Sequence, residues 1–203
     1  MSAKVKMLPV GDLGTNCYFL IDDEANKAAL IDPGGDADRL EAILKDLGVE
    51  LEYILLTHGH YDHTTGVPDL HEAFPNAKIY IHQADANGAG RALFPLAGQV
   101  DELFLYDEGD TLEMGSLTIR VMHTPGHTEG SVCLLVDDVI FAGDTLFCHS
   151  CGRTDLPGGS PEALTASLAR LKALEGDYRV MPGHNRATTL AIEREYNPFL
   201  KNL

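Results

Sequence analysis

Three histidines and an aspartate fall within seven residues, in the stretch THGHYDH at positions 57–63. Neutral imidazole and carboxylate groups are good ligands for zinc and related divalent ions. His58 and His60 are two residues apart and can share one ion. Asp62 and His63 lie on the opposite side of the same turn, where they can bind a second ion without crowding the first. The stretch therefore predicts more than one metal ion.

Three further candidate ligands each follow a strand-like run later in the sequence. They are His127 in HTPGHTEGS, Asp144 in FAGDTLF and His184 in VMPGHN. Any one of them alone would pass for an ordinary polar loop residue. Three of them at strand ends, together with the histidine stretch, favour a common site. We expect these side chains to meet where the loops converge.

The composition favours a globular protein that can fold around such a site. The 203 residues are 44% hydrophobic. A chain of this size buries roughly 70% of its unfolded surface, so we expect one domain over residues 1–203. Lys and Arg number 15 against 31 Asp and Glu, and the net charge of -16 would repel phosphate backbones and anionic lipid surfaces. Neither nucleic acid nor a membrane is an expected partner.

Two features bear on the compartment. The N-terminal stretch MSAKVKMLPVGDLG lacks the apolar region of a signal peptide, and no apolar run is long enough to span a membrane. The 4 cysteines have no regular spacing, which suits a reducing compartment. Together they predict a soluble, cytoplasmic protein.

The elements that must position the candidate ligands alternate between strands and helices in two similar halves. In the first half, CYFLID and KAALID predict a β-hairpin, a helix runs from Asp36 as N-cap to Gly48 at C′, and YILLT leads into the histidine stretch. In the second half, LTIRVM, SVCLLV and DVIFAG predict strands, and a helix from Ser160 to Gly176 precedes the strand YRVMP. This order predicts an α/β fold of two sheets covered by outer helices.

The motifs HxHxDH, TPGHT, GDTLF and PGHN, in this order and spacing, resemble those of the metallo-β-lactamase superfamily over nearly the whole chain. The stretches TNCYFLID and LIDPGG resemble its glyoxalase II branch, the hydroxyacylglutathione hydrolases, and specifically the short bacterial type that lacks a C-terminal helical segment. This resemblance implies the metallo-β-lactamase fold, an αββα sandwich of two mixed sheets flanked by helices.

The resemblance also implies which residues bind metal and how. It implies a centre for two divalent ions, with one group of ligands at His58, His60 and His127, a second group at Asp62, His63 and His184, and a bridging carboxylate at Asp144. All these ligands are nitrogen or oxygen donors, which suit zinc, iron or manganese. Zinc is the expected metal.

A centre with two metal ions is suited to hydrolysis. A hydroxide held between them stays a nucleophile near neutral pH, because the metals lower the pKa of bound water. A thioester carbonyl that reaches one ion is polarised, and the oxyanion that develops is stabilised. Asp62 can orient the hydroxide and accept its proton. The expected function is hydrolysis of a small-molecule thioester, such as a glutathione conjugate, by attack of the metal-bridging hydroxide.

Arg153, in CGRTDLPGG, is a candidate substrate-binding residue. In the glyoxalase II pattern, a basic residue at this place contacts the glycine carboxylate of glutathione. The planar fork of arginine suits a carboxylate. The alternative for Arg153 is a surface salt bridge.

The roles of several other polar residues stay open. Asp32 ends KAALID and is expected either to support a metal ligand or to cap the turn that follows. His149 follows Asp144 closely enough to face a substrate or solvent. Cys148 and Cys151 are expected to be free thiols, because no second pair of cysteines completes a structural zinc site.

Two alternative functions share these motifs. Persulfide dioxygenases share CGRTD and use a single iron held by two His and one Asp, although their pattern tends to replace PGHN, which is intact here. A non-catalytic metal-binding protein on the same fold is the second alternative, since a fold does not prove activity. True β-lactamases lack the aspartate of GDTLF, so Asp144 argues against β-lactam hydrolysis.

Overall fold

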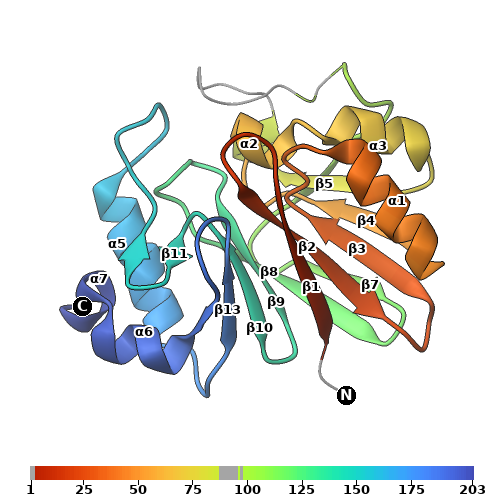
Figure 1. Ribbon diagram of the computed structural model, residues 1–203. Helices are drawn as coiled ribbons and strands as arrows, with labels where there is room; N and C mark the ends of the chain where they lie inside the picture. The colour runs from red at the N-terminus through yellow and green to blue at the C-terminus, as the bar shows by residue number, and fades with distance from the viewer. Residues whose placement is uncertain (1–2, 87–95, 97) are drawn as a thin grey trace.

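The computed structural model of the protein describes residues 3–86, 96 and 98–203 as two mixed sheets that pack face to face (Figure 1). The first sheet has the order β1-β2-β3-β4-β5-β6, with β1 Lys4–Val10, β2 Thr15–Asp22, β3 Lys27–Ile31, β4 Glu50–Leu55, β5 Lys78–His82 and β6 Phe104–Tyr106. The second has the order β14-β13-β10-β9-β8-β7, with β14 Thr188–Thr189, β13 Arg179–Pro182, β10 Val139–Gly143, β9 Val132–Val136, β8 Leu117–His123 and β7 Thr111–Met114. A small hairpin pairs β11, Leu146–Phe147, with β12, Ser150–Cys151.

Helices cover the outer faces of the two sheets. They are α1 Ala37–Leu47, α2 Tyr61–Thr64, α3 Val67–Ala73, α4 Gln83–Ala86, α5 Pro161–Lys172, α6 Leu190–Tyr196 and α7 Pro198–Lys201. The helices α1 and α3 lie against the first sheet, and α5 and α6 lie on the side of the second (Figure 1). Among the described residues, no helix has both the length and the apolar character needed to cross a bilayer. The predicted αββα sandwich is confirmed.

Central strands are buried on both faces, which explains why their sequences are nearly continuous apolar runs. In β2, Tyr18 and Leu20 point into the layer between the sheets, whereas Phe19 and Ile21 pack under the helices. Across that layer the ring of Tyr18 lies 5.4 Å, centroid to centroid, from the ring of Phe141 in β10. The apolar layer therefore joins the sheets and fixes where the strands of one sheet end relative to the other.

The helix α1 differs in one detail from the prediction. It begins after Asp36 and ends before Gly48, whose φ of 65° is the left-handed conformation expected at C′. Asp36 occupies the N-cap position, but its φ is 51° and its side chain makes no capping hydrogen bond. Its carboxylate instead accepts a hydrogen bond of 2.9 Å from the N–H of Gly11. The predicted N-cap position is therefore confirmed, but a contact with a distant loop takes up the side chain in place of a capping hydrogen bond.

Candidate metal centre

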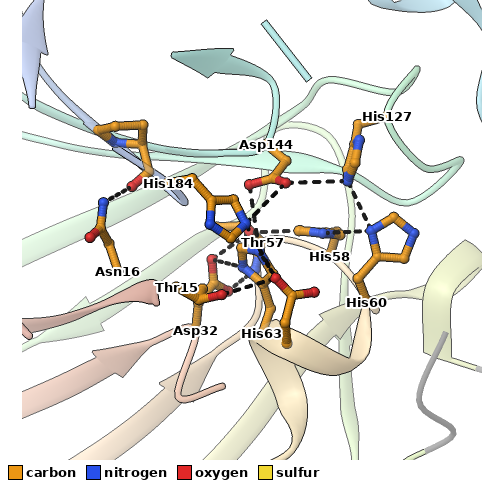
Figure 2. A network of polar contacts seen from close by, with 12 residues as sticks. Thr15, Asn16, Asp32, Thr57, His58, His60, His63, His127, Asp144 and His184 are labelled. Carbon is orange, nitrogen blue, oxygen red and sulfur yellow. Dashed lines mark hydrogen bonds and ion pairs between the residues drawn. The ribbon is translucent and has the colours of Figure 1, made fainter. Parts of the chain in front are cut away.

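The seven predicted ligand residues come together in loops that follow four strands. Figure 2 shows six of them: His58, His60, His63, His127, Asp144 and His184. The loop after β4 and the helical turn α2 supply the first four, and the loops after β8, β10 and β13 supply one each: His58, His60, Asp62, His63, His127, Asp144 and His184. One sheet therefore contributes four of the side chains and the other sheet contributes three.

Three buried imidazoles form the first group, which we call the three-histidine group: His58, His60 and His127. The Nδ1 atom of His60 lies 3.1 Å from Nε2 of His58 and 2.8 Å from Nε2 of His127. Two imidazole nitrogens bound at 2.0–2.1 Å to one tetrahedral zinc ion are about 3.3 Å apart. The three nitrogens thus converge at a spacing close to that of ligands of one ion.

Asp62, His63 and His184 form the second group. The Oδ2 atom of Asp62 lies 3.2 Å from Nε2 of His184 and 3.5 Å from Nε2 of His63. Asp144 lies between the two groups. Its Oδ1 is 3.5 Å from Nε2 of His63, and its Oδ2 is 3.5 Å from Nε2 of His127 in the first group and 3.6 Å from Nε2 of His184 in the second. One carboxylate therefore reaches both sets of imidazoles, as bridging requires.

Hydrogen bonds at the Nδ1 atoms orient three of the imidazole rings. His127 Nδ1 donates to the carbonyl oxygen of Arg153 at 2.8 Å, and His63 Nδ1 donates to Oδ2 of Asp32 at 2.9 Å. His58 Nδ1 lies 3.2 Å from the hydroxyl of Thr57, which itself donates to Asp32 at 2.6 Å. Each ring then directs Nε2 toward the cluster, which is the usual support of a histidine ligand.

Some buried atoms of the cluster are left without a hydrogen-bond partner. Among the described residues, Nε2 of His60, Nε2 of His63 and Oδ1 of Asp144 are buried and have none. A buried polar atom without a partner costs free energy, so such atoms are uncommon unless a ligand completes them. A divalent cation bound in the cluster would satisfy Nε2 of His63 and Oδ1 of Asp144. The residues present therefore fit a metal centre of nitrogen and oxygen donors.

Two rings of the three-histidine group, His58 and His60, favour the neutral form of imidazole. Burial and the neighbouring imidazoles of His63 and His127 lower the pKa of His58 well below its ordinary value. Burial, together with His127, lowers the pKa of His60 to about 4. These rings are neutral at physiological pH, which is the form that binds metal.

The second group has the opposite tendency. Burial alone would lower the pKa of His63, but the charges of Asp32 and Asp144 raise it to about 9. A hydrogen bond to Asp62 raises the pKa of His184. Although burial raises the pKa of Asp62, its hydrogen bond with His184 and the charge of His63 keep that pKa below its usual range. Carboxylates and imidazoles of this group are therefore paired as charges.

Contacts between the sheets hold the loop of His184 in place, and no local sequence pattern predicts them. The side-chain amide of Asn16 donates to the carbonyl oxygens of Pro182, at 3.0 Å, and Asn185, at 2.8 Å. The hydroxyl of Tyr18 also donates to the Pro182 carbonyl, at 2.6 Å. Figure 2 shows Asn16 reaching toward this loop from the first sheet. The only sequence signal was the position of both residues in TNCYFLID.

A cavity of about 230 Å³ opens onto the cluster. It is lined by Leu13, His60, Tyr61, Asp62, His127, Asp144, Arg153, Leu156 and His184. Arg153, the candidate substrate-binding residue, is among the residues that line the cavity. Its guanidinium also makes the alternative surface salt bridge, a bidentate pair with Asp155 at 2.6 and 2.7 Å.

Other residues left open by the sequence lie farther from this cavity. His149 lines a separate depression with Cys148, Asn185 and Arg186, and its side chain is 42% exposed.

The predicted free thiols at Cys148 and Cys151 are confirmed. Asp32 supports a ligand, because it accepts the hydrogen bond from His63.

Comparisons with known proteins agree with this geometry. The family model described as the metallo-beta-lactamase superfamily matches residues 10–184. The chain is 34% identical to hydroxyacylglutathione hydrolase GloC of Haemophilus influenzae over 209 residues, which cover 98% of each chain.

Two solved structures have similar folds. The crystal structure of BLEG-1 B3 metallo-beta-lactamase matches with a TM-score of 0.87 and 36% identity, over 97% of this chain and 99% of that one. The crystal structure of TTHA1623 in a di-iron-bound form matches with a TM-score of 0.81 and 36% identity, over 96% of this chain and 100% of that one. With the fold, the clustered motifs and the family match in agreement, the chain belongs to the metallo-β-lactamase superfamily.

Proposed function

We propose that this protein is a hydrolase with a two-metal centre that cleaves small-molecule thioesters, in the manner of a hydroxyacylglutathione hydrolase. The observation that carries the proposal is the shared position of Asp144, whose carboxylate lies within 3.6 Å of imidazole nitrogens from both groups of ligands. The similarity to GloC over almost the full length of both chains supports the choice of thioester.

The ligands divide between two ions as follows. His58, His60 and His127 would hold one ion, and Asp62, His63 and His184 would hold a second, with Asp144 within reach of both groups. Zinc is the metal we favour for these donors, and the di-iron form of TTHA1623 makes iron the main alternative. When bound, such ions lower the pKa of a coordinated water and polarise a carbonyl oxygen.

Asp62 is the residue that handles the proton of the attacking water. Its carboxylate lies at the cavity, and its lowered pKa keeps it ionised at neutral pH. The hydroxyl of Thr15 donates a hydrogen bond of 2.9 Å to Oδ2 of Asp62 and fixes its orientation. A positioned carboxylate of this kind accepts a proton and returns it to the departing thiolate.

The volume of the cavity limits how much of a substrate can lie beside the metal ligands. At about 230 Å³ it is smaller than typical sites for drug-sized molecules, so it accommodates the reacting acyl end of a substrate. The thiol-bearing part of the substrate then extends past the rim, where Arg153 lies. A carboxylate on that part of the substrate can replace Asp155 as the partner of the guanidinium, because an exposed ion pair is weak.

β-Lactam hydrolysis is the second candidate function, because BLEG-1, a B3 metallo-beta-lactamase, is 36% identical to this chain. The first prediction separates the candidates. Purified zinc protein should hydrolyse S-lactoylglutathione with a kcat/KM at least about a hundredfold above that for any common β-lactam. Faster turnover of β-lactams would reverse the order of the two candidates. Oxygen uptake with glutathione persulfide that exceeds thioester hydrolysis would instead favour a dioxygenase.

A second prediction concerns the pH dependence of metal binding. His63 carries a proton at neutral pH because its pKa is about 9, and it must lose that proton to bind metal. Affinity for the ion of the second group should therefore rise about tenfold per pH unit from neutral pH and level off near pH 9. Competition with a chelator of known affinity, at several pH values, measures this slope.

The raised pKa of His63 also affects the stability of the metal-free protein. That stability should fall as the pH rises, whereas the metal affinity should increase. Its contribution to stability is fully present below the ordinary pKa of 6.5 and is lost as the pH rises through about 9. The variant Asp32→Asn provides the control, because it removes a charge that raises the pKa of His63. The metal affinity of the Asp32→Asn variant should level off at a lower pH than that of the wild-type protein. A slope of zero for both ions between neutral pH and pH 9 would contradict the assignment of His63 as a ligand.

A third prediction separates recognition from chemistry at Arg153. Arg153→Ala should leave metal content unchanged and raise KM for a thioester that carries a carboxylate, with kcat/KM falling about tenfold to a hundredfold. A neutral thioester serves as the matched substrate and should be affected little. Asp155→Asn should lower KM for the carboxylate substrate, since it frees the guanidinium. Equal losses on both substrates would show that Arg153 does not recognise the carboxylate.

A further inference from the structure

In addition to Asp32, a buried carboxylate lies next to the loops that carry the three-histidine group. Asp85, in helix α4, is only 2% exposed, and among the described residues no cationic side chain forms an ion pair with it. Burial of an unpaired carboxylate costs several kcal/mol unless hydrogen bonds offset the lost hydration. The partners of Asp85 therefore indicate what the burial achieves.

Those partners belong to the two loops that carry the three imidazoles. The Oδ2 atom of Asp85 accepts a hydrogen bond of 2.8 Å from the N–H of Gly59, which lies between His58 and His60. The same oxygen accepts one of 2.7 Å from the hydroxyl of Thr128, the residue that follows His127. One oxygen atom thus joins a loop of the first sheet to a loop of the second.

The other oxygen of Asp85 binds the second loop again. Its Oδ1 accepts a hydrogen bond of 2.9 Å from the N–H of Gly130. A Cβ atom added to Gly130 would lie 2.6 Å from Cγ of Asp85, so the loop backbone rests directly on the carboxylate. Glycine is needed at this place for the close approach. The contact is therefore part of how the loop is built.

The spacing of the imidazoles depends on how these two loops are held. His60 and His127 come from different sheets, yet their nearest nitrogens lie 2.8 Å apart. We propose that Asp85 is a positioning residue that sets the separation of the three imidazoles and thereby the metal affinity of the three-histidine group. The inference rests on the metal centre of the proposed function, but it concerns only metal binding.

Asp32 shows the same principle at the second group by a different route. It accepts hydrogen bonds directly from the imidazole of His63 and from the N–H and hydroxyl of Thr57. Asp85 contacts no ligand side chain among its hydrogen bonds and acts only through the backbone and Thr128. Asp32 therefore supports His63 directly and His58 through Thr57, whereas Asp85 acts on the two loops of the three-histidine group.

The test is a titration of metal-free protein with zinc, without substrate, by chelator competition and calorimetry. Asp85→Asn should lower the affinity for one of two ions about tenfold to a hundredfold and leave the other unchanged. The matched control is Asp22→Asn, since Asp22 is also buried, at 5% exposure, and accepts hydrogen bonds from the N–H groups of Ser116 and Ala25, away from the centre. It should change neither affinity.

A second pair of variants identifies which ion is affected. In a His184→Ala background, which impairs the second group, Asp85→Asn should keep its full effect on the remaining ion. In a His60→Ala background, which impairs the three-histidine group, Asp85→Asn should not change the affinity for the remaining ion. Co²⁺ bound in place of zinc gives a second measurement of the affected site. The intensity of its visible absorption bands depends on ligand geometry.

Some outcomes would overturn the inference. Equal weakening of both ions, or no change in either, would show that Asp85 only stabilises the fold. If Asp85→Asn does not fold, Thr128→Val removes one of the three hydrogen bonds and should weaken the same ion to a smaller extent. An absence of thioester hydrolysis in the wild-type protein would overturn the proposed function and leave this comparison intact.

Discussion

The position of one sheet relative to the other is the constraint on which the centre depends. The imidazoles of His60 and His127 belong to different sheets, and metal ligands must be held to within about 0.5 Å of their binding geometry. The apolar layer that contains Tyr18 and Phe141 provides this precision, because close-packed interiors resist small displacements. Polar contacts across the sheets, such as those of Asn16, then fix the loops themselves.

The two groups of ligands differ in their charge, although they share Asp144. In the three-histidine group, burial and neighbouring imidazoles lower the pKa values of His58 and His60. The second group pairs imidazoles of raised pKa with the carboxylate of Asp62. A cation at the first group therefore meets neutral rings at His58 and His60 near neutral pH, whereas a cation at the second must displace a proton from His63. The environment thus makes the two positions unequal.

The ligands could be predicted from the sequence because each follows a strand in a short motif, so local spacing and strand order suffice to bring them together. Contacts that orient those ligands could not be predicted in the same way. Asn16 and Pro182 are separated by 166 residues, and neither the amide nor the carbonyl has a local signature. Asp85 gave no signal at all, since a single aspartate after a strand resembles any residue that begins a helix.

The fold shows a similar division between what local pattern reveals and what it does not. The two layers and the central strands followed from apolar runs. The strands that the pattern did not predict include β1, β6, β7 and β14, which are the edge strands of the two sheets. Edge strands are short or lack a buried face, and β1 also contains Pro9, so hydrophobic alternation is weak there. Pairing with a neighbour defines them rather than their own sequence.

The number of divalent ions bound per chain tests the two-metal centre most directly. Elemental analysis of protein reconstituted with excess zinc and then desalted measures it. The arrangement of ligands on either side of Asp144 predicts two ions per chain in the wild-type protein, and fewer in a folded Asp144→Ala variant. A single ion per chain at saturation of the wild-type protein, with Asp144→Ala binding equally well, would contradict it.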